Sequence, residues 1–184
     1  MKKQANKLES LLPWARAMAR MRARACTISD QLGVSSAEAR RVWREENGQS
    51  SPSGLQPSHF DWYLKTPERR YQSALLVLLD QKALSQYPSA VAFTHAYYHF
   101  SRMTAGEWQK NGTRDPAFRD KEGDYTIPYS RGFYLVKNYQ DSLYPDNSRK
   151  CELLLRACRQ CRGKYMSHRD EPGGQCPVCA SNER

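Results

Sequence analysis

The chain has 184 residues, with 29 lysines and arginines against 19 acidic residues and a formal net charge of +10 at pH 7. It holds no apolar run near 18 residues and no leader-like segment, so we expect neither a membrane span nor export. The positive charge lies at the two ends: basic and acidic residues number 10 and 5 in residues 1–50, 11 and 10 in residues 51–148, and 8 and 4 in residues 149–184. Two basic ends favour a polyanionic partner such as nucleic acid, with simple solubility as the alternative.

The first fifty residues predict a helix followed by a helical hairpin. Apolar residues recur at helical spacing from Lys7 to Arg24. Residues 27–43 then resemble a helix-turn-helix, in which Gly33 supplies the positive φ of a tight turn. Helical hairpins without DNA partners share this spacing, so a purely structural role stays open.

The second helix of this hairpin carries candidate DNA contacts. Ser35 or Ser36 would cap its first turn, and Glu38 is placed to complete a capping box. Arginines at this density contact phosphates more often than bases. The predicted DNA-contacting residues in this helix are Ser35, Ser36, Arg40, Arg41 and Arg44.

A linker and a helical core follow. Residues 48–66 are rich in serine, proline and glycine and separate residues 1–47 from a core at residues 67–149. Aromatic residues concentrate in this core, where they form either its packing or a surface for a protein partner. His95 and His99 have the spacing of a metal-chelating pair, but a surface or core-edge pair is favoured because no acidic partner accompanies them. Helices are predicted at residues 68–85, 89–107 and 128–141, with a polar loop at residues 111–124.

Residues 150–184 contain two C-x-x-C pairs separated by fourteen residues, which can bring four thiolates to the corners of one tetrahedron. Two disulfides or four ordinary thiols are the alternatives, but this spacing favours one structural Zn²⁺ per chain. The predicted ligands are Cys158, Cys161, Cys176 and Cys179. Four basic residues beside them are further candidates for DNA contact, namely Arg159, Arg162, Lys164 and Arg169.

The cysteines also allow expectations about where the protein is located and whether it is an enzyme. Cys26 and Cys151 have no evident partner, and zinc thiolates must stay reduced, so we expect a cytoplasmic protein. Four thiolate ligands leave no open coordination position, and the chain shows no phosphate loop, nucleophile elbow or paired catalytic carboxylates. We therefore expect no enzymatic activity.

The linker resembles a motif of the FlhC family, whose members are subunits of the bacterial flagellar master transcriptional activator. The residues at matching spacings are Gly48, Pro52, Gly54, Pro57, Asp61 and Trp62. The segment Cys158–Cys179 is similar to the family's zinc region, with His168 inside its loop. Residues 85–150 depart from the flagellar members, and the chain looks at least as similar to the compact relatives AcaC and SetC of conjugative elements.

The resemblance implies a mainly α-helical transcriptional activator subunit in the bacterial cytoplasm, with an N-terminal helix-turn-helix-like region and a small C-terminal zinc module of four cysteines. It further implies work in a hetero-oligomer with a FlhD-like partner on double-stranded promoter DNA, recruitment of RNA polymerase, and control of flagellar or conjugative-transfer operons. Two other classes remain open. One is a zinc-ribbon module that binds only protein, and the other is an RNA-binding regulator that prefers single strands.

Overall fold

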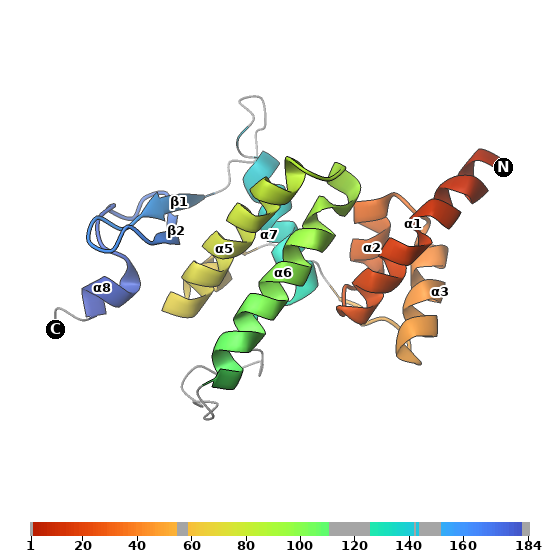
Figure 1. The fold of residues 1–184 in the computed structure, drawn as a ribbon, viewed down its shortest axis with the longest axis horizontal. Helices are drawn as coiled ribbons and strands as arrows, with labels where there is room; N and C mark the ends of the chain where they lie inside the picture. Colours follow the sequence, from red (N-terminus) through yellow and green to blue (C-terminus); the bar gives the residue numbers. More distant parts are fainter. Residues whose placement is uncertain (1, 55–58, 111–125, 142, 144–151, 182–184) are drawn as a thin grey trace.

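The computed structural model describes residues 2–54, 59–110, 126–141, 143 and 152–181. These residues form eight helices and one antiparallel two-stranded sheet, which confirms the mainly α-helical prediction (Figure 1). The helices are α1 (Lys2–Arg20), α2 (Ala25–Leu32), α3 (Ser36–Asn47), α4 (Asp61–Leu64), α5 (Pro67–Leu84), α6 (Ser89–Lys110), α7 (Tyr129–Asp141) and α8 (Pro177–Ser181). The strands are β1 (Leu153–Ala157) and β2 (Lys164–His168).

Helices α1, α2 and α3 pack together around a small core. The buried indole of Trp43 donates a hydrogen bond of 2.8 Å from Nε1 to the carbonyl of Ala23 and so joins α3 to the segment between α1 and α2. Gly33 ends α2 with a φ of +63°, as the sequence predicts for the turn. Ser35 caps α3 and forms the predicted capping box with Glu38.

The first helix ends earlier than the sequence predicts. The pattern extends the helix to Arg24, but α1 ends at Arg20. Arg22 adopts the left-handed conformation with a φ of +63°. Its N–H bonds the carbonyl of Ala19, and the next N–H bonds that of Met18, which is the Schellman arrangement that closes a helix. The sequence does not reveal this end of the helix for two reasons. The apolar spacing continues past Arg20, and the left-handed position is occupied by arginine rather than by glycine, the usual residue there.

The middle of the chain forms a body of three principal helices. The helix predicted at residues 68–85 is present as α5, which begins at Pro67 with Thr66 as its cap and lies side by side with α6 (Figure 1). Apolar residues lie on most sides of this helix, a pattern that predicts a helix buried in the core. Leu78 and Leu84 on α5 are nevertheless exposed. The predicted loop at residues 111–124 lies outside the described residues, as does Cys151.

Helix α7 packs closely against α5 and α6 at a glycine. A Cβ atom added to Gly132 would lie 2.5 Å from Cδ2 of Leu76 on α5 and 3.3 Å from Cζ of Phe93 on α6. A carbon at 2.5 Å would overlap its neighbour, so a side chain at this position would require Leu76 or α7 to shift.

Polar contacts attach the N-terminal helices to the body. The side chain of Gln31 donates to the carbonyl of Ala90 and to Oγ1 of Thr94, and it accepts from the hydroxyl of Tyr129. Along the long axis of the molecule, α1–α3 lie at one end and the two strands with α8 at the other, with α5–α7 between them (Figure 1). The two basic ends of the sequence therefore occupy opposite ends of the structure.

His95 is held by aromatic rings. Its ring stacks on Tyr87 with a centroid separation of 3.8 Å and contacts Trp14 at 4.9 Å. This environment matches the core-edge interpretation of the histidine pair, and His99 is exposed. Burial and the neighbouring His99 both lower the pKa of His95, which keeps its ring neutral and suited to stacking.

Candidate metal centre and basic surfaces

The first cysteine pair lies at the tip of the β1–β2 hairpin. The strands pair from Leu153 with His168 to Ala157 with Lys164, so that residues 158–163 form the connecting turn. Within it the N–H of Cys158 bonds the carbonyl of Gly163 at 2.9 Å, and Arg162 adopts a φ of +64°. The hairpin escapes sequence analysis because two five-residue runs, one of them mostly leucine, fit a helix as well as a strand.

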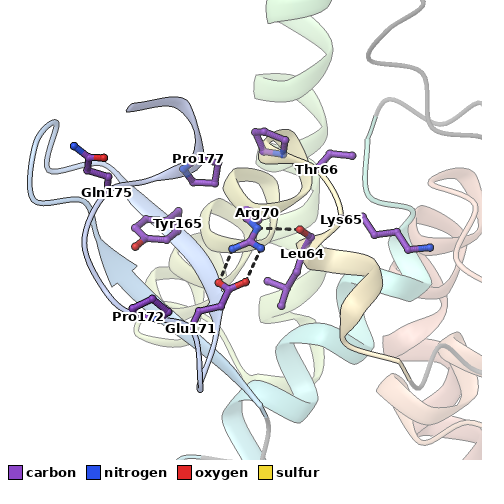
Figure 2. Close-up of a pocket in the computed structure, with 10 residues that line it drawn as sticks. Leu64, Lys65, Thr66, Arg70, Tyr165, Glu171, Pro172, Gln175 and Pro177 are labelled. Carbon is purple, nitrogen blue, oxygen red and sulfur yellow. Dashed lines mark hydrogen bonds and ion pairs between the residues drawn. The ribbon is translucent and has the colours of Figure 1, made fainter. Parts of the chain in front are cut away.

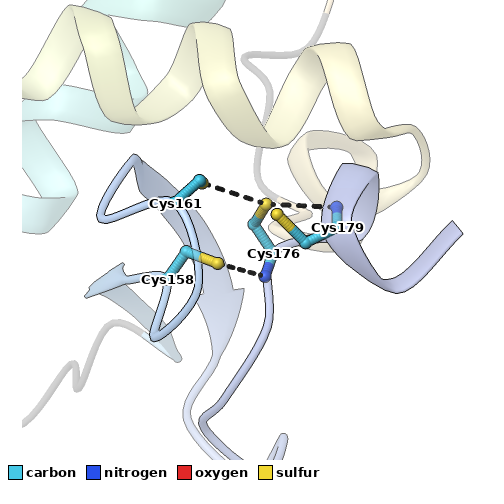
Figure 3. Close-up of side chains that lie close together, drawn as sticks. All are labelled: Cys158, Cys161, Cys176 and Cys179. Atoms are coloured by element: carbon cyan, nitrogen blue, oxygen red, sulfur yellow. Dashed lines mark hydrogen bonds between the residues drawn. The ribbon is translucent and has the colours of Figure 1, made fainter. Parts of the chain in front are cut away.

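The second pair opens α8. Pro177 begins this short helix directly after Cys176, and the N–H of Ala180 bonds the carbonyl of Cys176 at 3.0 Å. This turn brings Cys179 close to Cys176, the other cysteine of the pair. Figure 3 shows the four cysteine side chains converging, with Cys158 and Cys161 on the hairpin turn, Cys176 just before α8 and Cys179 on α8.

The sulfur positions fit one tetrahedral metal ion. The four Sγ atoms lie within 4.8 Å of one another, and Cys161 and Cys176 are separated by 3.8 Å. Zn–S bonds of about 2.3 Å in a tetrahedron place neighbouring sulfurs about 3.8 Å apart, whereas a disulfide requires about 2.05 Å. All four cysteines are free thiols in the structure. The cluster can therefore hold a metal ion, and the disulfide alternative does not match its geometry.

Backbone N–H groups are directed at two of these sulfurs and stabilise their negatively charged form. The N–H of Cys176 points to Sγ of Cys158 at 3.2 Å, and that of Cys179 points to Sγ of Cys176 at 3.5 Å. Donation from the N–H of Cys161, with smaller contributions from Cys176 and Gln160, lowers the pKa of Cys158 to about 6 although burial opposes it. A thiolate is the form that binds metal, so the backbone around Cys158 favours the binding state of that sulfur. The hydrogen bond with Cys176 acts in the opposite direction on Cys179 and raises its pKa to about 12.

Two consecutive residues of α5 anchor this module to the helical body, and sequence analysis identified neither of them. Arg70 forms a two-armed ion pair with Glu171, at 2.6 Å and 2.7 Å. Tyr71 packs against Cys158, Tyr165 and Cys176. No sequence signal marks Arg70 or Tyr71, because both lie on an otherwise ordinary helix far before the first cysteine pair.

An open groove of about 380 Å³ follows the seam between this module and the start of α5 (Figure 2). Its floor holds the ion pair of Arg70 and Glu171, and Tyr165 and Pro177 line the module side. The loop that forms one wall is fixed by Arg156, whose Nη2 donates to the carbonyl of Glu171 at 2.8 Å.

The candidate DNA contacts on α3 fall into two groups. Ser36, Arg40, Arg41 and Arg44 are exposed, while the opposite face of α3 buries Ala39, Val42 and Trp43. The hydroxyl of Ser35 is already engaged, because it accepts from the N–H of Glu38 and donates to the carboxylate of that residue. Ser35 therefore serves first as a helix cap.

Ion pairs with acidic side chains of α3 engage one of these arginines and another arginine on α1. Arg41 pairs with Glu45 at 2.7 Å, and on α1 Arg20 pairs with Glu46 at the same distance. Arg44, by contrast, has no ion-pair partner in the part of the chain that the structure describes. A ligand would thus meet Arg44 directly but would have to compete with Glu45 for Arg41.

The basic residues of the cysteine module lie far from α3. The side chains of Arg159, Arg162, Lys164 and Arg169 are exposed on the hairpin and the loop after it. They sit at the opposite end of the long axis from α3 (Figure 1). The two predicted sets of DNA contacts therefore form two separate surfaces.

No protein-family model matches the chain, and no curated protein is significantly similar to it in sequence. Among the residues that the structure describes, no helix has the length and apolar character needed to cross a membrane.

Proposed function

We propose that this chain is a sequence-specific DNA-binding subunit of a cytoplasmic bacterial transcriptional activator, built around one structural Zn²⁺ on its four clustered cysteines. In this proposal it acts with a FlhD-like partner subunit and switches on flagellar or conjugative-transfer operons. The partner, the recruitment of RNA polymerase and the class of operon rest on the resemblance to the FlhC family.

The exposed face of α3 is the observation that carries the proposal. Ser36, Arg40 and Arg44 recur every four residues on this face, and the helix follows a short α2 through a glycine turn. A helix presented in this way, with a buried back and an arginine-bearing front, suits the major groove. Arg44 is the best candidate for a direct contact, because no described acidic residue competes for it and because Arg40, which also lacks a described acidic partner, donates from Nε to the carbonyl of Ser36.

Zinc is the ion that best suits the four sulfurs. A set of four thiolates in tetrahedral reach is typical of structural zinc and leaves no position for a substrate. In this proposal the module depends on the ion. Among its described residues, Leu153 and Met166 are buried in the cluster shared with the helical body, and the separate cluster holds only Cys158, Tyr165 and Cys176. Metal binding would supply on the order of 10 kcal/mol toward folding the module.

The two separated basic surfaces favour an assembly over a single chain on DNA. Arg159, Arg162, Lys164 and Arg169 could hold phosphates at a distance from the bases contacted by α3. Paired copies of the chain, related by the symmetry of a hetero-oligomer, would then engage two half-sites. This arrangement predicts an operator with two related sequences at a fixed spacing.

Selection from a random duplex library tests the proposal. The protein, purified from its host with any subunits that accompany it and loaded with Zn²⁺, should enrich one motif with two half-sites. In competition binding to that motif, Arg44→Ala should lose about 10-fold to 100-fold in specific affinity, as expected for loss of a base contact. Lys82→Ala, an exposed charge on α5, is the matched control and should change affinity little.

The rival classes predict different results from the same material. A preference for single-stranded RNA over every duplex would support an RNA-binding regulator. Failure to bind any nucleic acid at physiological salt would support a module that binds only protein, and either result would contradict the proposal.

A further inference from the structure

Tyr71 on α5 lies against the cysteine cluster although it belongs to the helical body. Its ring packs against the buried cluster of Cys158, Tyr165 and Cys176, and this packing brings its hydroxyl within reach of the thiol of Cys176. It is therefore a contact from outside the cysteine module to one of the four candidate ligands.

A hydroxyl in this position is a natural donor to a metal-bound sulfur. A coordinated thiolate keeps unused lone pairs, and an O–H group directed at one of them stabilises its charge and fixes its orientation. The N–H of Cys179 already points to the same sulfur at 3.5 Å. Cys176 would thus accept one bond from its own turn and one from α5.

The neighbouring residue holds Tyr71 in place. Arg70 donates from both Nη atoms to Glu171 and from Nε to the carbonyl of Leu64 at 2.9 Å. Glu171 in turn accepts from the N–H of His168 at 3.2 Å, so the loop between β2 and the second cysteine pair is fixed on α5. This rigid attachment gives Tyr71 a defined position relative to Cys176.

We propose that Tyr71 is an outer-shell donor to the metal site and couples metal occupancy to the helical body. Metal at the cysteines then stabilises the first turns of α5, and the folded body in turn strengthens metal binding, because the two effects are linked. The inference rests on the proposed metal occupancy but not on DNA binding.

Zinc affinity of the full-length chain provides the first test, measured by competition with a chromophoric chelator. Tyr71→Phe keeps the ring and removes only the donor, so it should weaken Zn²⁺ binding about tenfold or more. Tyr98→Phe removes an exposed hydroxyl on α6, away from the cysteines, and should leave the affinity unchanged. Equal affinities of Tyr71→Phe and the unaltered protein would overturn the proposal, as would failure of the unaltered protein to bind Zn²⁺.

Hydrogen exchange tests the coupling and separates it from a folding defect. In the unaltered protein, Zn²⁺ should slow exchange of the amides at residues 71–76, and in Tyr71→Phe this effect should shrink. The metal-free forms of both proteins should show equal helical circular dichroism. Exchange in α5 that does not respond to Zn²⁺ in the unaltered protein would overturn the coupling, whether or not the chain binds DNA.

Discussion

Arg70 and Glu171 are 101 residues apart in sequence, yet their side chains form a two-armed ion pair of 2.6 Å and 2.7 Å. The pair joins the central helix of the body to the loop that carries the second cysteine pair. The hydrogen bond from Arg70 is the main cause that lowers the pKa of Glu171 below its ordinary value. The stabilisation is therefore present at neutral pH and is lost as the pH falls through that lowered pKa.

Glu171→Gln should loosen the cysteine module at neutral pH, because the glutamine removes the charge that both arms of Arg70 bind. We expect limited proteolysis between the body and the module to become several-fold faster. Asp170→Asn is the control, since the side chain of Asp170 is 86% exposed and lies beside the same loop. Equal cleavage rates for the two variants would show that the ion pair contributes nothing to the attachment.

Cys161→Ser should abolish binding of the metal ion while leaving most of the helices folded. Loss of one of four sulfurs opens the coordination sphere, and the module has little core of its own to replace it. We expect no Zn²⁺ to remain bound after purification, and a protease-sensitive C-terminal segment. Cys26→Ser, at an exposed site on α2, should retain the metal. A Cys161→Ser protein that keeps one Zn²⁺ per chain would refute the ligand set.

Asp80→Asn should stabilise the protein above pH 6. Asp80 is buried on α5 with Gln140 of α7 as its hydrogen-bond partner, and burial raises its pKa to about 6. The folded state then binds a proton more tightly than the unfolded state, so stability falls as the pH rises from about 4 to 6. Melting temperatures across this range should lose that decline in the variant, with a gain of about 3 °C at a pH of about 7.5. If the melting temperature depends on pH in the same way in both proteins, Asp80 is not the group whose titration lowers the stability.

Arg22→Gly should raise stability, because an arginine at a φ of +63° is strained and a glycine is not. We expect a gain of about 0.5–1 kcal/mol in the free energy of unfolding, measured by urea titration. Arg22→Ala removes the same charge but keeps the Cβ atom, so it should give no such gain. A similar gain in both variants would assign the effect to charge rather than to backbone conformation.

Gly132→Ala should destabilise the body by about 1–3 kcal/mol, because the new methyl group would overlap Leu76 on α5. Gly174→Ala is the control, since no atom lies within 4 Å of the position that its Cβ atom would take. Denaturant titration of the two variants provides the measurement. An unchanged midpoint for Gly132→Ala would mean that α7 can move away from α5 at little cost.

Local signals in the sequence were sufficient for the helix caps and the cysteine cluster. Gly33, Ser35 and Glu38 act within a few residues of one another, so their turn and capping box follow from spacing alone. The four clustered cysteines likewise follow from two short repeats. In each case the interacting residues are close in sequence or are of a distinctive type such as cysteine, so a short stretch of sequence is enough to predict them.

Tertiary contacts explain what the sequence could not predict. The pairing of Arg20 with Glu46 depends on how α1 packs on α3, and the contact of Tyr71 with the cysteines depends on where the hairpin docks. Neither has a spacing signature. The early end of α1 was missed for a different reason, since Arg22 occupies a position where glycine is the expected marker.

The central claim is that the chain is a DNA-binding activator subunit, and the most direct measurement is its occupancy of DNA in the native host. The protein should be crosslinked to DNA, immunoprecipitated, and its bound fragments sequenced. We predict discrete peaks upstream of promoters that contain two half-sites and that are lost in Arg44→Ala. The genes downstream would separate flagellar control from conjugative transfer. An absence of peaks, in cells where the zinc-loaded protein is shown to be present, would contradict the claim.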